Sequence, residues 1–249
     1  MKKNNVFFGE HETFVKCVAF DKDGTLFDAM GFWTYIDNLR EETFSSLVGS
    51  EHKSAWSKLM GITDAAVDHH GVLAVASLQE EIVLVAGLIY QLKGWPWVRC
   101  KEVAAEIFKT ADSRLKIDRA FNKVEGVPDI FHQLMEAGIH TGIMTSDALA
   151  RTEDCMRLLD ILDFLDFIIT PEKVKNGKPA PDMVHIACES LGIQPSEIAV
   201  IGDSIVDMRM AKAAGCLAVG IITYEGSAEV LAPEADLLIH SIRDIKVKA

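Results

Sequence analysis

The residues best suited to chemistry begin with two carboxylates that stand two positions apart. Asp21 and Asp23 lie in the segment FDKDGTLFD, which runs from Phe20 to Asp28 and directly follows an apolar run. Carboxylates that leave a strand into a Gly-Thr turn can face one substrate atom, so that one attacks while the other transfers a proton. An acidic turn that contains a glycine is also common without any function, and this segment alone favours that simpler interpretation.

Three further polar clusters argue against coincidence. The segment TSD places Thr145 and Ser146 before a helical stretch, where hydroxyls and the N–H groups of a helix N-terminus suit a phosphate group. The segment GKPAPD holds Lys178 in front of another helical stretch, and GDSIVD contributes Asp203 and Asp207. Four polar clusters in this order are poorly explained as four unrelated turns.

Electrostatics indicates which chemistry these residues perform. If Asp21, Asp23, Asp203 and Asp207 meet in one crevice, they repel each other and any anionic substrate. A hard cation relieves such crowding, and a set of oxygen ligands points to Mg²⁺. The cation and Lys178 would shield a phosphate group from the attacking carboxylate. An acyl phosphate also hydrolyses readily, which favours an aspartate over a serine as the nucleophile.

Apolar runs typical of strands covered on both faces are placed to position these clusters. Because ligands of open α/β sheets bind at the carboxyl ends of the strands, we expect the clusters to lie along one edge of a sheet. The runs are Val15–Phe20, Ile139–Met144, Phe167–Ile169, Ile198–Ile201 and Leu217–Ile222.

Helix-period segments separate the strands from about Glu125 onward. Several have a proline near the start or a glycine just past the end, as helices do. This alternation predicts an α/β fold with a doubly wound parallel sheet. The helical segments are Pro128–Ala137, Ala148–Leu159, Pro181–Leu191 and Ile205–Ala214.

The stretch between the first strand and the rest of the sheet has a different pattern. It contains amphipathic segments and no convincing strand. We therefore predict an α/β core formed by residues 1–28 and 120–249, with an inserted all-helical cap domain at 29–119. The expected cap helices are Phe32–Leu47, Lys53–Met60, Leu78–Leu92 and Trp97–Thr110.

Composition narrows the partners and the compartment. The net charge of the 249 residues is −12, whereas a nucleic-acid interface needs an excess of Lys and Arg. The longest apolar run, Ile82–Leu92, is shorter than the roughly 20 residues that span a bilayer. The 5 cysteines are dispersed without metal-site spacing, which is typical of reduced thiols. We expect a cytoplasmic protein that binds neither nucleic acid nor membrane, and the sequence leaves monomer and homodimer open.

With its four clusters in this order, the sequence resembles the haloacid dehalogenase superfamily. The resemblance is to the phosphoglycolate phosphatase and β-phosphoglucomutase group, which has a helical cap of the C1 type. It covers the whole chain and implies a Rossmann-like core. By this resemblance, Asp21 is the nucleophile and also binds Mg²⁺. Asp23 is the general acid and base, and its backbone carbonyl binds the metal.

The resemblance also implies roles for the other clusters. Thr145 holds the transferred phosphoryl group, helped by the backbone of Ser146, and Lys178 pairs with the phosphate and the nucleophile. Asp203 is a direct metal ligand, and Asp207 is one that often acts through water. The cap closes over the site and selects the leaving group.

Position 23 separates the possible activities. Dehalogenating members of the superfamily lack an aspartate there, so Asp23 favours phosphoryl transfer. P-type ATPases are similar in their Asp-Lys-x-Gly-Thr order, but they have threonine at this position. We expect a Mg²⁺-dependent phosphatase that acts on a small phosphorylated metabolite, with phosphoglycolate as the first substrate to test. A phosphomutase acting on a sugar phosphate is the alternative, and a non-enzymatic binding protein is a third, less favoured hypothesis.

Several weaker candidates receive simpler interpretations. Lys173 and Lys175 could replace Lys178, but the Gly-Lys-Pro context favours Lys178. Asp147 and Asp182 are expected to cap or favourably charge helix N-termini.

Within the cap, His69 and His70 are expected to form a solvated surface pair. Trp95 and Trp97 are expected to anchor the small core of this domain. Three cations could meet a second anionic group of the substrate: Arg40, Lys53 and Arg99. Outside the cap, the segment Val6–Phe8 could pack on the edge of the core or form a dimer contact.

Overall fold

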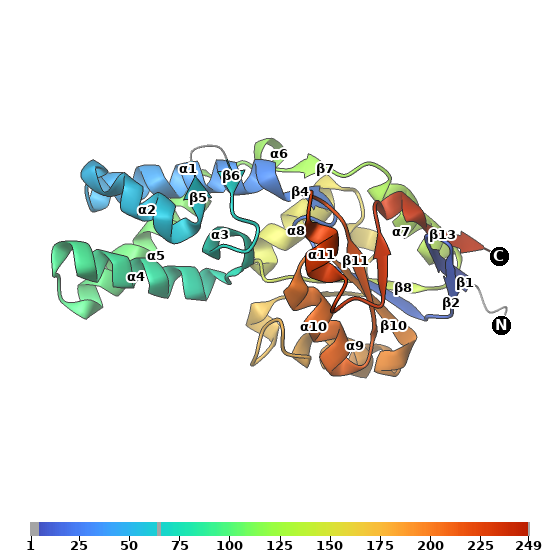
Figure 1. Cartoon of the computed structure of the whole chain (residues 1–249). Coiled ribbons are helices and arrows are strands. Elements are labelled where there is room, and N and C mark those ends of the chain that lie inside the picture. Colours follow the sequence, from blue (N-terminus) through green and yellow to red (C-terminus); the bar gives the residue numbers. More distant parts are fainter. Residues whose placement is uncertain (1–4, 64–65, 249) are drawn as a thin grey trace. The chain divides into compact units, whose positions relative to one another are not determined.

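The computed structural model describes residues 5–63 and 66–248, which fall into two compact units (Figure 1). The core unit comprises Met1–Asp28 and Lys123–Ala249, and the helical unit comprises Ala29–Asn122. The chain returns from the helical unit to the core unit after residue 122, whereas we expected this boundary after residue 119. The shift has a physical reason, because Phe121 is buried and stacks on Phe32 of the helical unit with ring centroids 4.3 Å apart.

The described part of the core unit contains a six-stranded parallel sheet, which confirms the predicted fold class. Its strand order is β12-β11-β10-β3-β8-β9. Along the chain the order reverses on either side of β3, and such a switch point opens a crevice at the carboxyl ends of the strands. The strands are β3 (Cys17–Phe20), β8 (His140–Met144), β9 (Phe167–Ile169), β10 (Ile198–Gly202), β11 (Leu217–Ile221) and β12 (Leu237–Ile239).

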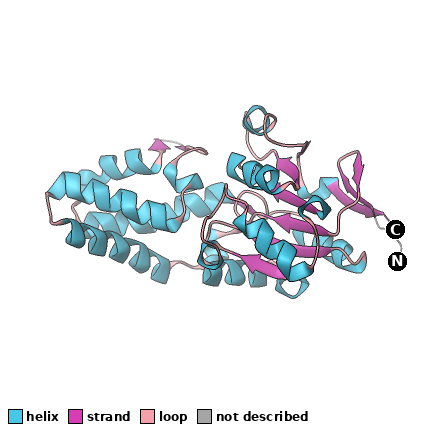
Figure 2. Cartoon of the chain, turned by 90° about the horizontal axis from the view of Figure 1, so that it is seen from below, coloured by secondary structure: helices cyan, strands magenta, loops and turns pink. Residues whose placement is uncertain are grey.

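Helices cover both faces of this sheet (Figure 2). Successive side chains of β3 point to opposite faces. Cys17 and Ala19 pack with Met183 and Met208 from two of the helices, whereas Phe20 contacts Phe131 on the other side, with ring centroids 4.8 Å apart. The helices of the core unit are α7 (Val127–Glu136), α8 (Leu149–Leu158), α9 (Asp182–Leu191), α10 (Ile205–Ala214) and α11 (Ser227–Leu231).

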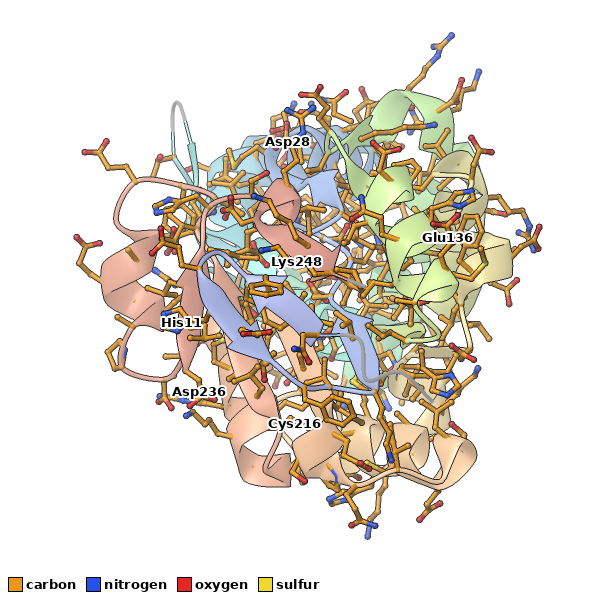
Figure 3. All side chains as sticks on the ribbon, turned by 90° about the vertical axis from the view of Figure 1, so that its right-hand side faces the viewer. His11, Asp28, Glu136, Cys216, Asp236 and Lys248 are labelled. Atoms are coloured by element: carbon orange, nitrogen blue, oxygen red, sulfur yellow. The ribbon has the colours of Figure 1, made fainter. Side chains whose placement is uncertain are left out.

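A small antiparallel sheet lies on the face of the core unit that Figure 3 presents, where His11 and Lys248 are labelled. Val6 and Phe8 of its central strand are buried, and Lys248 lies over the ring of Phe7 at 4.5 Å. The segment Val6–Phe8 therefore packs within the core unit. The strands, in sheet order, are β13 (Ile245–Lys248), β1 (Asn5–Phe8) and β2 (His11–Thr13).

The helical unit is not entirely helical, because β5 (Ile62–Thr63) and β6 (Ala66–Val67) pair as a short hairpin. Two more short strands, β4 (Phe27–Asp28) and β7 (Asn122–Lys123), form a two-stranded sheet. The helices are α1 (Ala29–Leu47), α2 (Lys53–Met60), α3 (Val72–Val75), α4 (Leu78–Lys93), α5 (Trp97–Arg114) and α6 (Ile117–Ala120).

Short 3₁₀ segments occur in both units, at Ser50–His52, Leu162–Phe164, Pro171–Lys173, Pro195–Glu197 and Ile242–Asp244.

The tryptophans that anchor the helical unit are not the expected ones. Trp56 is completely buried and lies near Phe44 and Phe108, with ring centroids 5.0 and 6.4 Å away. Trp97 is instead 43% exposed, and Trp95 lies 4.0 Å from the Arg99 guanidinium. The prediction was wrong because Trp95 lies in the connection between α4 and α5, and Trp97 is the exposed first residue of α5.

Polar side chains of the helical unit also differ from expectation. Arg40 is buried, pairs with Glu81 at 2.8 Å and lies over the ring of Phe108, so it belongs to the interior of this unit. Lys53 pairs with Glu41 at 2.6 Å. His69 is half-buried with its ring edge-on to Trp33, so the expected solvated pair is wrong for this residue.

No helix among the described residues has the length and apolar character needed to cross a bilayer.

Asp37 is a buried carboxyl group in the helical unit. Its Oδ1 accepts a hydrogen bond of 2.8 Å from Nε1 of Trp56. Burial raises the pKa of Asp37 to about 6, although the Trp56 hydrogen bond and Arg40 act to lower it, and Glu41 adds to the increase. The folded unit therefore holds this proton over a pH range in which the unfolded chain releases it.

We predict that Asp37→Asn removes a pH-dependent loss of stability. The pKa in the folded state is raised, so the wild-type protein loses stability as the pH rises from about 4 to about 6. Between pH 4 and pH 7, the free energy of unfolding of the variant should increase by as much as about 3 kcal/mol relative to that of the wild type. Urea unfolding followed by tryptophan fluorescence measures this, because all 4 tryptophans lie in the helical unit.

The control for this experiment is Asp118→Asn, which changes an exposed aspartate of the same unit. Its stability relative to the wild type should stay nearly constant with pH. A constant difference for Asp37→Asn as well would contradict the assignment.

Candidate active site

Polar side chains follow three neighbouring strands of the sheet. Asp21 comes directly after β3, Thr145 directly after β8, and Asp203 directly after β10. The backbone remains tied to the sheet at these points, because the Asp21 N–H donates to the Ile201 carbonyl at 2.8 Å and the Thr145 N–H to Ile169 at 3.1 Å. The sheet edge therefore fixes where these side chains begin.

The structure brings four of the predicted residues into direct proximity. Asp21, Asp203 and Asp207 each offer a carboxylate oxygen, and these oxygens lie within 4.8 Å of one another. The buried Nζ of Lys178 lies 2.6 Å from Oδ1 of Asp21 and 2.5 Å from Oδ1 of Asp207. Lys173 instead donates to the carbonyl of Ile168, which supports the choice of Lys178.

Asp207 is held by the first turn of α10. The N–H of Ser204 donates to its Oδ2 at 3.2 Å, and the hydroxyl of Ser204 donates to the same oxygen. The remaining oxygen, Oδ1, faces Lys178. A carboxylate in this position is also favoured by the partial positive charge of the helix N-terminus.

Two glycines make room for the carboxylates. A Cβ on Gly24, whose φ is +81°, would overlap the carboxylate of Asp203. A Cβ on Gly202 would overlap the side chain of Asp207. The backbone at these two positions comes so close to the acidic groups that only glycine fits.

The crowding disturbs proton binding. Burial raises the pKa of Asp21 to about 7, with Asp207 and Asp23 adding to the effect and Lys178 opposing it. Burial, Asp21 and Asp207 raise the pKa of Asp203 well above its usual value. Burial alone would lower the pKa of Lys178, but Asp207 and Asp21 outweigh it and raise that pKa.

The donor set fits a hard divalent cation. Three ionised carboxylates and one ammonium group leave two negative charges without a balancing positive charge in a largely buried space. The available donor atoms are carboxylate oxygens at close spacing, the ligand type that Mg²⁺ and Ca²⁺ prefer. Asp21, Asp203 and Asp207 are the residues that could hold such an ion.

The side chain of Asp23 lies in a different set of charges. Its Oδ1 accepts a hydrogen bond from Nζ of Lys22 at 2.7 Å, and Lys22 is completely buried. The same Nζ lies 2.9 Å from Oδ2 of Asp147. Asp147 in turn accepts hydrogen bonds from Nε of Arg151 at 2.7 and 2.9 Å.

Sequence reasoning missed Lys22 and Arg151 and gave Asp147 too small a role. Asp147 does accept a hydrogen bond of 2.7 Å from the N–H of Ala148, next to the start of α8, but its carboxylate also joins two cations. The signal available in the sequence was a lysine placed between two carboxylates directly after a strand. Asp182, the first residue of α9, accepts two hydrogen bonds of 3.0 Å from Asn176.

Thr145 and Ser146 complete the arrangement at the end of β8. Thr145 is buried, and its Oγ1 accepts a hydrogen bond of 3.1 Å from the N–H of Asp147. Since this N–H occupies an acceptor position of the oxygen, the hydroxyl hydrogen of Thr145 can point elsewhere as a donor. Both residues precede α8, which is the position expected of an anion-binding segment.

We predict that two isosteric substitutions in this cluster have opposite effects on the metal-free protein. Asp203→Asn should raise the free energy of unfolding by about 1 to 3 kcal/mol, because it removes a charge that burial and two neighbouring carboxylates disfavour. Asp207→Asn should lower it by about 2 kcal/mol or more, because it removes a charged partner from the buried Lys178. Urea unfolding in EDTA, followed by far-ultraviolet circular dichroism, measures both changes. Shifts of the same sign would contradict this account.

Comparison with known proteins identifies a hydrolase family and relatives that are named as phosphatases. Residues 15–215 match the family described as haloacid dehalogenase-like hydrolase. The chain is 30% identical over 210 residues to validoxylamine A 7'-phosphate phosphatase of Streptomyces hygroscopicus subsp. limoneus, covering 81% of this chain and 92% of the relative. It is 28% identical over 241 residues to a phosphoglycolate phosphatase of Shigella boydii serotype 4, covering 93% of this chain and 91% of that relative.

Among solved structures, CbbY of Rhodobacter sphaeroides in complex with phosphate shares the fold. It aligns with a TM-score of 0.63 at 20% identity, covering 92% of this chain and 95% of that one. The family match and the relatives together confirm the resemblance that the four clusters predicted. This chain therefore belongs to the haloacid dehalogenase-like hydrolase family.

Proposed function

We propose that this chain is a Mg²⁺-dependent phosphatase that hydrolyses a small phosphate monoester through an aspartyl-phosphate intermediate on Asp21. The observation that carries the proposal is the position of the Asp21 carboxylate at the switch point of the sheet. It lies 2.6 Å from Lys178 and within metal-ligand spacing of Asp203 and Asp207. A nucleophile in this position has a cation beside it and acidic groups that can hold a second one.

The metal would be held by Asp21, Asp203 and Asp207, with the backbone carbonyl of Asp23 as a further ligand. When bound, Mg²⁺ supplies positive charge that offsets the carboxylates and the phosphate group. The excess of two negative charges in the cluster supports a divalent ion.

The chain's own residues perform the bond changes. A carboxylate oxygen of Asp21 attacks phosphorus while the ester P–O bond breaks, and Asp23 gives its proton to the departing alkoxide oxygen. Asp23, now a carboxylate, then takes a proton from a water molecule as that water attacks the phosphorus of the acyl phosphate. Inorganic phosphate leaves, and both aspartates return to their starting states.

Other side chains hold the phosphoryl group during these steps. The Asp147 N–H binds Thr145 Oγ1, which directs the hydroxyl hydrogen of Thr145 towards a phosphate oxygen. Lys178, already placed beside the nucleophile, pairs with a second oxygen. The backbone N–H of Ser146 is proposed as a third donor.

The substrate is proposed to be a small phosphorylated metabolite. The relatives are named as phosphatases of phosphoglycolate and of validoxylamine A 7'-phosphate. Phosphoglycolate is therefore the first substrate to test. We assign the helical unit, Ala29–Asn122, the role of the cap that selects the leaving group.

We predict that Asp21→Asn abolishes turnover of p-nitrophenyl phosphate and of phosphoglycolate in the presence of Mg²⁺. An amide is a poor nucleophile, so the rate should fall by about 10⁴-fold or more, as it does when other enzymes lose their nucleophile. EDTA should stop the wild-type reaction and Mg²⁺ should restore it. The control is Asp163→Asn, which changes an exposed aspartate outside the site.

The products of the wild-type reaction test the reaction type. Free phosphate as the sole phosphorus product supports a phosphatase. A phosphate that moves to another position of a sugar, through a bisphosphate that can be trapped, would identify a mutase instead. Sustained turnover by Asp21→Asn would overturn the choice of nucleophile.

We also predict that Gly24→Ala weakens Mg²⁺ binding by about 10-fold or more, because its Cβ displaces Asp203 from the cluster. Calorimetric titration of Mg²⁺ into the folded variant measures this without any need for turnover. The matched control is Gly87→Ala, since a Cβ at this position of α4 meets no atom within 4 Å. Unchanged affinity in Gly24→Ala would contradict the assignment of Asp203 as a ligand.

A further inference from the structure

Four buried or half-buried charges form a chain of ion pairs that ends at Asp23. Arg151 contacts Asp147, Asp147 contacts Lys22, and Lys22 contacts Asp23. The Lys22 side chain is 0% exposed, and those of Asp147 and Arg151 are 7% and 10% exposed. When Asp23 is ionised, the chain holds two positive and two negative charges, so it is balanced without an added ion.

Such a chain is costly to build. Removing an ammonium group from water costs several kcal/mol, and apolar residues of similar size often give equal or higher stability. A fold therefore gains little stability from a lysine at position 22. The chain of ion pairs ends on the carboxyl group of Asp23, to which the proposed mechanism gives the proton transfers.

We propose that Lys22, anchored by Asp147 and Arg151, is a positioning residue that holds the Asp23 carboxyl group in the orientation needed for proton transfer. This inference rests on the proposed function. Lys22 binds Oδ1 of Asp23, which assigns proton transfer to Oδ2. Lys22 itself gives up no proton; the proton passes between Oδ2 and the oxygen of the leaving group or of water. Because proton transfer depends steeply on distance and direction, fixing one carboxylate oxygen fixes the other.

The two lysines of the site have separate tasks. Lys178 contacts Asp21 and Asp207, whereas Lys22 contacts Asp23 and Asp147. Lys178 thus contacts the proposed nucleophile, Asp21, and Lys22 contacts the proposed general acid and base, Asp23. Removal of Lys22 should therefore impair the proton transfers and leave nucleophilic attack largely intact.

Leaving groups of different basicity separate these two effects. p-Nitrophenolate is weakly basic and departs without a proton, whereas the alkoxide of phosphoglycolate must be protonated as it leaves. In Lys22→Met, kcat/KM for phosphoglycolate should fall by about 10²-fold, which is the lower end of the loss expected when general acid catalysis is removed. For p-nitrophenyl phosphate, kcat/KM should fall by only a few-fold. Equal losses for the two substrates would overturn the proposal.

A combination of variants tests the connection to Asp23. If Lys22 acts through Asp23, then Lys22→Met should cost little further activity towards phosphoglycolate in an Asp23→Asn background. Independent, multiplicative losses would overturn the proposal. The control is Lys212→Met, which removes the same charge from an exposed lysine paired with Asp236, and which should leave both rates unchanged.

Two further measurements keep the test decisive if Lys22→Met folds poorly or if turnover is undetectable. Asp147→Asn removes the anchor of Lys22 but retains the backbone N–H that binds Thr145, and it should give the same dependence on the leaving group, with smaller losses. A crystal structure of Lys22→Met or Asp147→Asn should show the Asp23 carboxyl group rotated away from its present position. An unmoved Asp23 would overturn the proposal independently of activity, whereas an inactive wild-type enzyme would contradict the proposed function itself.

Discussion

Mutual repulsion among carboxylates at the switch point is the constraint on which the site depends. Three acidic side chains converge there with oxygen atoms within 4.8 Å of one another, and Lys178 forms ion pairs with two of them, Asp21 and Asp207. Burial, together with the charges of Asp21 and Asp207, raises the pKa of Asp203 well above its usual value, so its charge is unfavourable in the metal-free protein. The surrounding structure sustains this arrangement through the sheet, two close glycines and the start of α10. Under the proposed function, a divalent cation would offset this repulsion, so that both the affinity for substrate and the chemistry would depend on that cation.

The second set of charges has the opposite character. Arg151, Asp147, Lys22 and Asp23 are balanced among themselves, and each group finds its partner within the protein. The two sets meet at the segment Asp21–Asp23, where neighbouring residues belong to different electrostatic environments. The Asp21 carboxylate lies among the unbalanced charges of the acidic cluster, while the Asp23 carboxylate is held by Lys22. Under the proposed function, this division would separate the attack on phosphorus from the transfer of a proton.

Much of the fold and of the carboxylate cluster could be predicted from the sequence, and the failures have physical causes. Continuous apolar runs such as Ile198–Ile201 identify buried strands, and Ile205–Ala214 is a helix with the expected ends. Asp21, Asp203 and Asp207 could be grouped because parallel strands end at one edge. Trp95 and Trp97 were misjudged because aromatic character does not say whether a residue lies on a buried helix face, at an exposed helix end or in a connection. Arg40 was misjudged because its partner, Glu81, lies 41 residues away and no local pattern joins them.

The position of Lys22 follows from the geometry of an extended chain once the helices are known. Side chains alternate along β3, so Cys17 and Ala19 face the helices α9 and α10, while Phe20 faces α7. If the alternation continues past the end of the strand, Asp21 points towards Lys178 and Asp207. Lys178 precedes α9, and Asp207 lies in the first turn of α10. The same alternation directs Lys22 to the opposite side, where Asp147 and Arg151 lie at the start of α8. The residue between Asp21 and Asp23 therefore enters the interior, where the buried Lys22 pairs with an acidic residue, Asp147, that follows the neighbouring strand β8. Lys22 and Asp147 therefore depend on each other structurally, although they lie 125 residues apart in the sequence.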